Sequence, residues 1–295
     1  MSDKDAAADV PLGGLTPAER VLLQKPQLEL AVVEVRFVGA QEAVTSEQAL
    51  AIRDAMDVAG YELPQVQPAQ TQDLTLRIDN GEVEPEVNTR AAGWVLTSAD
   101  GLFAATILPG VIAIQTTRYE RWSNSLEAPL FAVLKSVGAS LKPTIVQRIG
   151  LRYINRLHDE AASTIAAWTD AIAPSFFGVL NDPEIGPKAV ACQQQVSLEL
   201  GDTQGAVIRH GVFSDPSSRG MYSYLVDIDA FDHHSRAFSE KDICDRARAL
   251  NRTALSLFQQ VVTREYRDTM DPYAEVDSSG NAVQFKSGAG EGAVV

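Results

Sequence analysis

The segment from Gln147 to Leu157 constrains the fold of this chain more than any other, because its side chains alternate between two chemical types. Successive side chains of a strand point to opposite sides of a sheet. One face of such a strand would carry Ile149, Leu151, Tyr153 and Leu157, and the other Arg148, Gly150, Arg152, Ile154 and Arg156. The pattern predicts a strand with its apolar face in the core. Its three arginines would share the other face, each about 13 Å from the next at roughly 3.3 Å per residue.

Two interpretations of this arginine row stay open. Guanidinium groups match carboxylate and phosphate oxygens bidentately, and Gly150 would let a ligand or another chain approach the backbone. Arg148, Arg152 and Arg156, with Asn155 orienting the ligand, would then form an anion site. Alternatively, the arginines form an ion-pair ladder with carboxylates on neighbouring strands or on a covering helix, and Asn155 fixes a loop. The local charge balance favours the ladder.

Composition excludes several classes of protein. The chain has 295 residues, and its 45% hydrophobic content is too high for a mainly disordered protein. We expect no membrane span, since no apolar run approaches the roughly 18 residues that one needs. The polar, acidic start lacks the pattern of a secretory signal. Two isolated cysteines, Cys192 and Cys244, suit a reducing compartment, so we expect a cytoplasmic protein.

The net charge of −14 argues against nucleic acid as a partner, because binding a phosphate backbone needs clustered Lys and Arg. The charge is unevenly distributed, with seven basic against four acidic residues in 110–160 and an acidic excess in 40–100. The basic segment could pair internally with the acidic one or form a local basic groove.

The order of expected elements predicts an α+β fold of two packed lobes, each of largely antiparallel sheet with flanking helices, and the similar order in the two lobes leaves a duplicated plan open. We divide the chain into a polar leader (1–27), an N-terminal lobe (28–158), a C-terminal lobe (159–270) and a flexible tail (271–295). Alternation predicts strands near 28–38, 74–78, 90–97, 102–108, 111–119, 189–200, 206–213 and 221–230. Apolar periodicity and capping residues predict helices over about 45–59, 124–142, 164–180 and 239–268, with a short one at 18–23.

Four segments in matching order resemble a sporadically distributed family of uncharacterised prokaryotic proteins. They are Leu28 to Phe37, Arg118-Tyr119-Glu120-Arg121-Trp122, the strand Arg148 to Asn155, and Val226-Asp227-Ile228-Asp229. The family is marked by an Arg-Ile-Gly-Leu-Arg-Tyr-Ile-Asn strand, which Arg148 to Asn155 matches at every position. The resemblance covers roughly residues 26–270 and implies no particular reaction, cofactor or catalytic residue.

Aromatic and cationic side chains gather before the second long helix. Tyr119 and Trp122, together with Arg118, could stack on a base or another ring. A small anionic or nucleotide-like ligand would then lie near Arg148, Arg152, Tyr119 and Trp122. The same residues could instead anchor a strand-to-helix junction.

Asp227, Asp229 and His233 are the densest candidates for metal ligands, since carboxylate and imidazole suit Zn, Mn or Fe. A metal-dependent hydrolase is therefore one hypothesis. The competing interpretation is a solvated turn at the end of a strand.

The sequence contains no GxSxG elbow and no Gly-rich phosphate loop, and Cys192 lies on a core-facing pattern. We therefore expect no cofactor and lean against an enzyme. The leading hypothesis is a non-catalytic accessory protein, antitoxin-like or regulatory, that binds another protein. Its acidic charge would steer it toward a basic partner, and a homodimer stays open.

Overall fold

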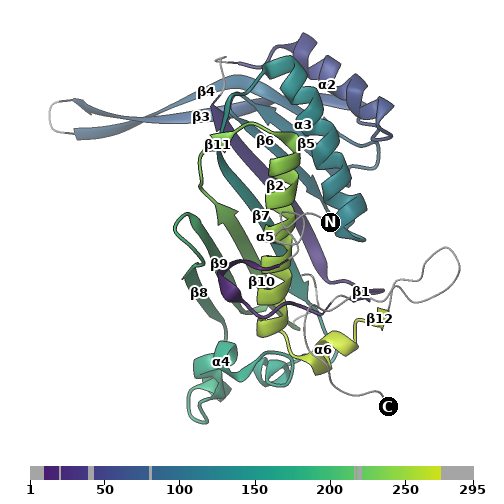
Figure 1. Ribbon diagram of the computed structural model, residues 1–295. Helices are drawn as coiled ribbons and strands as arrows, with labels where there is room; N and C mark the ends of the chain where they lie inside the picture. Colours follow the sequence, from purple (N-terminus) through teal and green to yellow (C-terminus); the bar gives the residue numbers. More distant parts are fainter. Residues whose placement is uncertain are drawn as a thin grey trace, which may run out of the picture.

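The computed structural model describes residues 10–19, 21–38, 43–79, 82–215, 217 and 221–273, with the backbone alone for 70–79 and 82–91. One large antiparallel sheet dominates these residues, so the predicted α+β class is confirmed (Figure 1). Its strands lie in the order β3, β4, β5, β6, β2, β7, β10, β9, β8, with β11 paired to the start of β7. Their bounds are β2 Leu28–Val38, β3 Gln65–Asp79, β4 Glu82–Thr97, β5 Phe103–Leu108, β6 Val111–Thr116, β7 Ile145–Leu157, β8 Cys192–Glu199, β9 Gln204–Ser214, β10 Tyr222–Asp232 and β11 Arg236–Ala237.

The two halves of the chain follow the same plan within this one sheet. Each begins with a strand (β2 or β7) that pairs with the last strand of its own meander (β6 or β10) and ends in a long helix. The leading strands β2 and β7 pair with each other at the centre of the sheet. The predicted lobes thus share a continuous sheet, and the topology repeats from β7, which lies before the predicted boundary after residue 158.

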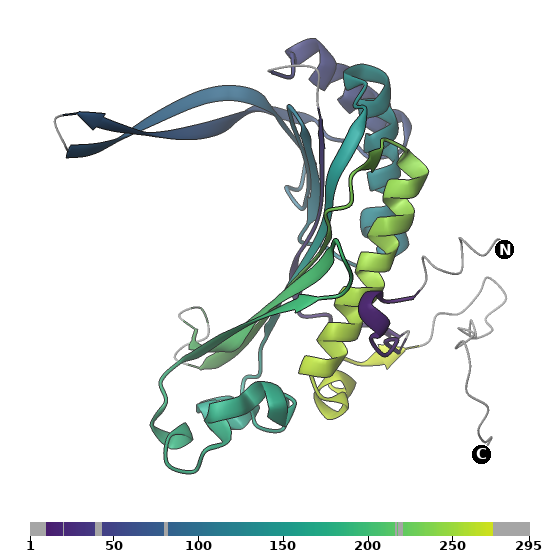
Figure 2. The same ribbon diagram turned by 60° about the vertical axis from the view of Figure 1, so that its left-hand side comes forward.

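The long helices lie on one face of the sheet. They are α2 (Ser46–Val58), α3 (Ala128–Leu141) and α5 (Glu240–Val261), and α5 crosses β7 and β10 (Figures 1 and 2). Thr45 forms the predicted capping box with Gln48, and Ser239 caps α5 by accepting a hydrogen bond from the amide of Asp242. None of the helices among the described residues has the length and apolar content needed to cross a bilayer.

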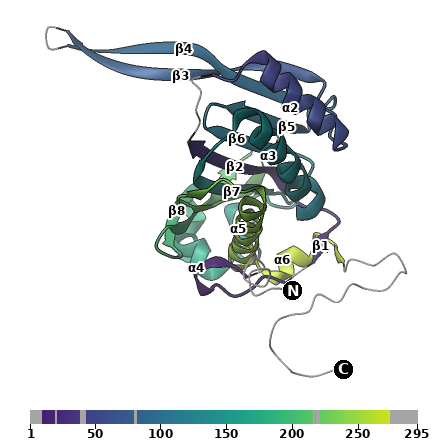
Figure 3. The same cartoon turned by 45° about the horizontal axis from the view of Figure 1, so that its top comes forward.

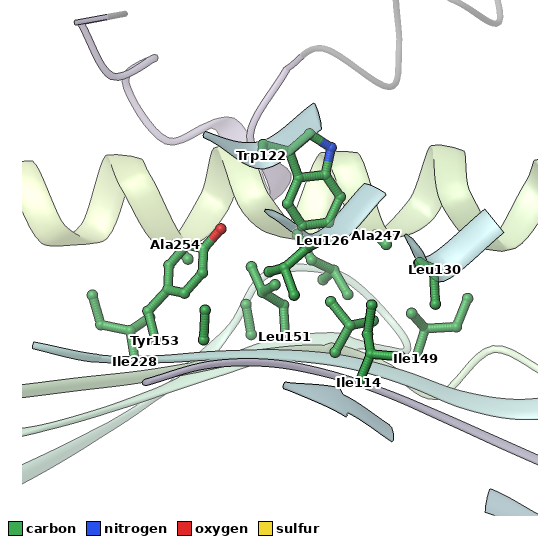
Figure 4. Close-up of a cluster of buried hydrophobic side chains, with 14 of the residues drawn as sticks. Ile114, Trp122, Leu126, Leu130, Ile149, Leu151, Tyr153, Ile228, Ala247 and Ala254 are labelled. Carbon is green, nitrogen blue, oxygen red and sulfur yellow. The ribbon is translucent and has the colours of Figure 1, made fainter. Parts of the chain in front are cut away.

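The core lies between the sheet and these helices. Ile149, Leu151 and Tyr153 are buried and point from β7 toward α3 and α5, as the alternation predicts (Figure 4). The other face of the sheet is concave. It lies between the projecting β3–β4 hairpin at one end and the segment around α4 (Pro174–Phe177) at the other (Figures 2 and 3). This uncovered face carries the arginines of β7.

Two predicted helices differ from the structure. The helix expected over 164–180 is instead a series of short turns at Ile165–Trp168, Pro174–Phe177 and Gly178–Asn181. Pro174 disfavours a helical conformation at Ala173, and Gly178 adopts a positive φ of 55°, so no continuous helix forms. The last helix ends at Val261, because Val262 is extended and forms a bridge with Ile172, and a separate helix α6 covers Arg264–Asp268.

The described residues of the leader and the tail pack against the rest of the fold. Residues 22–23 form a strand (β1, Leu22–Leu23), which replaces the expected helix at 18–23 and pairs with β12 (Pro272–Tyr273). A 3-10 turn at Leu12–Gly14 lies along α5, where the amide of Leu12 donates to Thr253 Oγ1 at 2.9 Å. The predicted flexible tail beyond residue 273 and the leader before residue 10 lie outside the described residues.

Candidate functional site

Arg152 and Asp227 form the best-ordered pair on the uncovered face. Arg152 Nε and Nη2 donate to Asp227 Oδ1 and Oδ2 at 2.8 and 2.7 Å, and Arg209 Nη1 lies 3.5 Å from Oδ2. Although it faces outward, Asp227 is only 3% exposed, because the two guanidinium groups cover it. The hydrogen bond to Asp227 raises the pKa of Arg152. This carboxylate is neutralised from both neighbouring strands.

Arg148 is held in the same way, four residues before Arg152 on the same face of β7. Its Nη1 lies 3.1 Å from Glu34 on β2, and its Nη2 lies 3.2 Å from Asp229 on β10. The guanidinium also stacks over the ring of Phe231 at 5.5 Å and lies directly above Gly150, where an added Cβ would meet Arg148 Nη1 at 2.3 Å. The room that Gly150 provides is filled by Arg148 itself rather than by a ligand.

Arg156 completes the row near the end of the sheet. Its Nε donates to Asp215 Oδ2 at 2.8 Å, and its Nη1 donates to Glu29 at 3.1 Å. Burial raises the pKa of Asp215, but hydrogen bonds from Ser223, Ser217 and Arg156 outweigh this effect and hold the pKa well below its ordinary range. All three arginines therefore have carboxylates within 4 Å, which confirms the ion-pair ladder. The anion site predicted on this row loses its support.

The predicted metal site does not form. Asp227 and Asp229 share a strand face as expected, but both are engaged by arginines. His233 lies beyond the strand and packs against Phe231, with ring centroids 4.8 Å apart. Within the described ranges, no three His, Cys, Asp or Glu side chains gather as metal ligands. The hydrolase hypothesis therefore has no metal centre here.

The structure separates the predicted aromatic residues from the arginine row. Tyr119 and Trp122 lie on the helix side of the sheet, where Tyr119 packs edge-on against Tyr153 at 5.5 Å. Because Tyr153 and Arg152 are adjacent in β7, their side chains point to opposite faces, so the predicted grouping of Tyr119 and Trp122 with Arg148 and Arg152 is wrong.

The two remaining predicted residues also have structural partners. Asn155 is buried on the helix side and donates to the carbonyl of Val226 at 3.2 Å. Arg118 is exposed and lies 3.3 Å from Asp100.

Tyr119, Trp122 and Asn155 border a cavity of about 450 Å³ on the helix side. Its walls come from five separate segments: residues 19–28, residues 119–127, the end of β7, the C-terminal half of α5, and α6 with the residues that follow it. The apolar part of the wall consists of Leu22, Leu23, Leu28, Leu255, Phe258 and Met270. This is the size and character of a small-molecule site.

Three residues of the cavity wall each carry a buried side-chain nitrogen without a hydrogen-bond partner. The nitrogens are Trp122 Nε1, Asn251 Nδ2 and Arg267 Nε. Asn251 is fully buried, and its other polar atom, Oδ1, accepts from the hydroxyl of Tyr153 at 2.8 Å. Because nearly all buried polar groups in proteins are paired, three unpaired donors around one cavity require an explanation.

The charged groups of the wall are almost balanced, with five arginines and four carboxylates. Arg248 bonds Glu127 and Asp245, and Arg264 bonds Glu19. Arg267 is less well compensated, because its Nη1 lies 3.7 Å from Glu19. Burial is the main cause that lowers the pKa of Arg267.

The two phenols beside the cavity stay protonated at neutral pH. Burial raises the pKa of Tyr119 to about 12 and that of Tyr153 well above its ordinary value. The hydroxyl of Tyr153 bonds Asn251 and lies 3.2 Å from the hydroxyl of Tyr119. These groups can orient a ligand, but neither is a base at neutral pH.

Comparison of the sequence with protein-family models and with curated proteins finds no match. The cavity residues that matter most, Asn251 and Arg267, were not singled out from the sequence. Asn251 is one polar residue on the apolar side of a periodic helix, which is the one signal that could have indicated it.

Proposed function

We propose that this protein is a non-catalytic binder of a small organic molecule, which it holds in the cavity between α5, α6 and residues 119–127. The observation that carries the proposal is a cavity of about 450 Å³ whose wall includes Trp122, Asn251 and Arg267, three residues that each hold a buried side-chain nitrogen without a hydrogen-bond partner.

The energetic argument rests on these donors. Each buried group left without a partner costs about 1–3 kcal/mol. A ligand that supplies acceptors would recover this cost while its apolar part covers Leu255, Phe258 and Met270.

The available side chains support binding rather than chemistry. The phenols remain protonated, and the guanidinium groups are permanent donors. Such a wall can orient a molecule and neutralise its charge, which fits a sensor, carrier or accessory protein.

A thermal-shift screen of the full-length protein against organic acids, amines and neutral compounds tests the proposal. A ligand present at 100 times its dissociation constant should stabilise the protein by about 2.7 kcal/mol. Leu255→Trp fills the cavity, and Trp122→Phe removes one donor while keeping an aromatic ring, so both variants should lose the shift. Arg152→Met, on the other face, is the matched control and should keep it. No stabilising compound, or shifts unchanged in Leu255→Trp, would overturn the proposal.

A second candidate function is the binding of another protein, which the sequence favours, and the uncovered concave face is the surface that could serve it. Apolar side chains there, Val32, Val207 and Phe231, are half-buried and surround the arginine–carboxylate pairs. Their mixture of apolar and charged groups suits a protein partner. A pull-down from native lysate would test this, with Val32→Asp and Val207→Asp expected to weaken capture. Failure to recover a stoichiometric partner, with a monomer by light scattering, would count against it.

The cytoplasmic location and the membership of the prokaryotic family also stay proposals. The free thiols of Cys192 and Cys244 support a reducing compartment. The acidic net charge supports a protein or small molecule, rather than nucleic acid, as partner.

A further inference from the structure

We infer that the cavity ligand is an organic anion: a carboxylate or similar acidic group attached to an apolar body. This inference rests on the proposed function and specifies the ligand chemistry.

The polar groups of the cavity wall that need partners are all of one kind. The unpaired buried atoms that belong to residues of the cavity wall are all N–H donors, from Trp122, Asn251 and Arg267. The Oδ1 of Asn251, which could have accepted from a ligand, is already occupied by Tyr153. A carboxylate offers about four lone-pair sites and no proton of its own, so it complements this set, whereas an ammonium group would add donors where acceptors are needed.

The charge at the cavity points the same way. Arg267 has a side chain only 12% exposed, and its carboxylate neighbour Glu19 lies 3.7 Å away, beyond hydrogen-bond distance. Glu19 is shared with Arg264. Asp268 and Glu265 also act on the charge of Arg267, but none of these carboxylates forms a hydrogen bond with its guanidinium among the described contacts, so this largely buried cation can accept an additional negative charge close by.

The apolar wall defines the remainder of the molecule. The cavity wall includes the apolar side chains of Leu22, Leu23, Leu255 and Phe258, so an inorganic ion alone would leave these side chains uncovered. At about 30 Å³ of liquid volume per water-sized group, the cavity holds on the order of 15 non-hydrogen atoms. The predicted ligand is therefore a compact aryl or alkyl acid.

Two series with matched apolar bodies test the inference: phenylbutyrate, phenylbutylamine and phenylbutanol, and octanoate, octylamine and octanol. Affinities for the full-length protein would be measured by isothermal titration calorimetry, with inorganic phosphate as a probe of charge without an apolar body. We expect at least one carboxylate to bind about tenfold or more tightly than its amine and alcohol, and phosphate not to bind. Trp122→Phe and Arg267→Met should each weaken the carboxylate about tenfold, and Arg152→Met should leave it unchanged.

The outcomes separate this inference from the proposed function. Amines or alcohols that bind as tightly as the carboxylates, with binding lost in Leu255→Trp, would overturn the anionic class and leave a ligand cavity. A screen that yields only neutral or cationic cavity ligands, with no binding of either carboxylate, would likewise overturn the anionic class and leave a ligand cavity. Binding that persists in Leu255→Trp, or no cavity ligand of any class, would overturn the proposed function itself.

Discussion

Arg152 on β7 donates through Nε and Nη2 to both carboxylate oxygens of Asp227 on β10, at 2.8 and 2.7 Å. The pair lies on the face of the sheet opposite the helices and ties two central strands together. With the bonds of Arg148 to Glu34 and Asp229, it links β2, β7 and β10 across the join between the two halves. The arginines of β7 therefore have a structural role, because they hold neighbouring strands of the sheet together.

Removing the Arg152–Asp227 ion pair should destabilise the fold. Arg152→Met leaves Asp227 with one distant guanidinium, and we expect a loss of about 1–2 kcal/mol, since Arg152 itself is half exposed. Arg118→Met, which breaks the exposed pair with Asp100, is the control and should cost less than about 0.5 kcal/mol. Urea unfolding measures both. Equal losses of unfolding free energy in the two variants would show that the Arg152–Asp227 pair stabilises the fold no more than an exposed ion pair does.

The effect of a substitution at Gly150 on stability should depend on the presence of Arg148. A side chain at position 150 displaces the Arg148 guanidinium, so Gly150→Val is expected to cost about 1–2 kcal/mol. In an Arg148→Met background the same substitution should cost much less, because the obstructing group has gone. This double-mutant cycle would contradict the interpretation if the two effects were simply additive.

His210 should make the protein sensitive to mild acid. Burial lowers its pKa below the ordinary 6.5, and its Nδ1 lies 2.8 Å from the hydroxyl of Tyr224. Below about pH 6.5 the unfolded state then binds more protons than the folded state, so stability falls as the pH decreases. His210→Gln should lose less stability than the unmodified protein between neutral pH and about pH 5, whereas the exposed control His158→Gln should behave like the unmodified protein. Parallel losses in all three proteins would contradict the assignment.

The two thiols should differ in reactivity. Cys244 is buried, and burial, with help from Glu127 and Asp245, raises its pKa to about 12, while Cys192 is half exposed. Alkylation of the native protein followed by mass spectrometry should label Cys192 alone at pH values up to about 9. Cys192→Ala should abolish native labelling. Modification of Cys244 without denaturant would show that α5 opens readily.

Local patterns predicted much of the fold. The alternation of β2 and β7 and the capping box of α2 lie within short segments, and the structure confirms each of them. The strand predicted at 74–78 begins earlier, at Gln65 of β3, because Pro68 is tolerated on an edge strand that lacks a second neighbour. The interruptions of the predicted helices at Pro174 and Val262 depend on tertiary context, and the sequence did not predict them.

The functional residues were harder to predict, because they depend on which distant segments become neighbours. Asp227 and Asp229 stood out as a carboxylate pair, but only the pairing of β7 with β10 shows that arginines occupy them. Tyr119 and Trp122 were identified as candidates, but the cavity beside them is completed by α5, α6 and the leader. Nothing local to Asn251 or Arg267 indicates that their nitrogens would lack partners.

The most direct test of the central claim is to locate the ligand by variant, with the melting temperature of the full-length protein as the readout. A compound that stabilises the unmodified protein should lose its effect in Leu255→Trp and Trp122→Phe and keep it in Arg152→Met. That pattern places the site in the cavity beside Asn251. The reverse pattern, with stabilisation lost in Arg152→Met and retained in Leu255→Trp, would place binding on the arginine face and contradict this account.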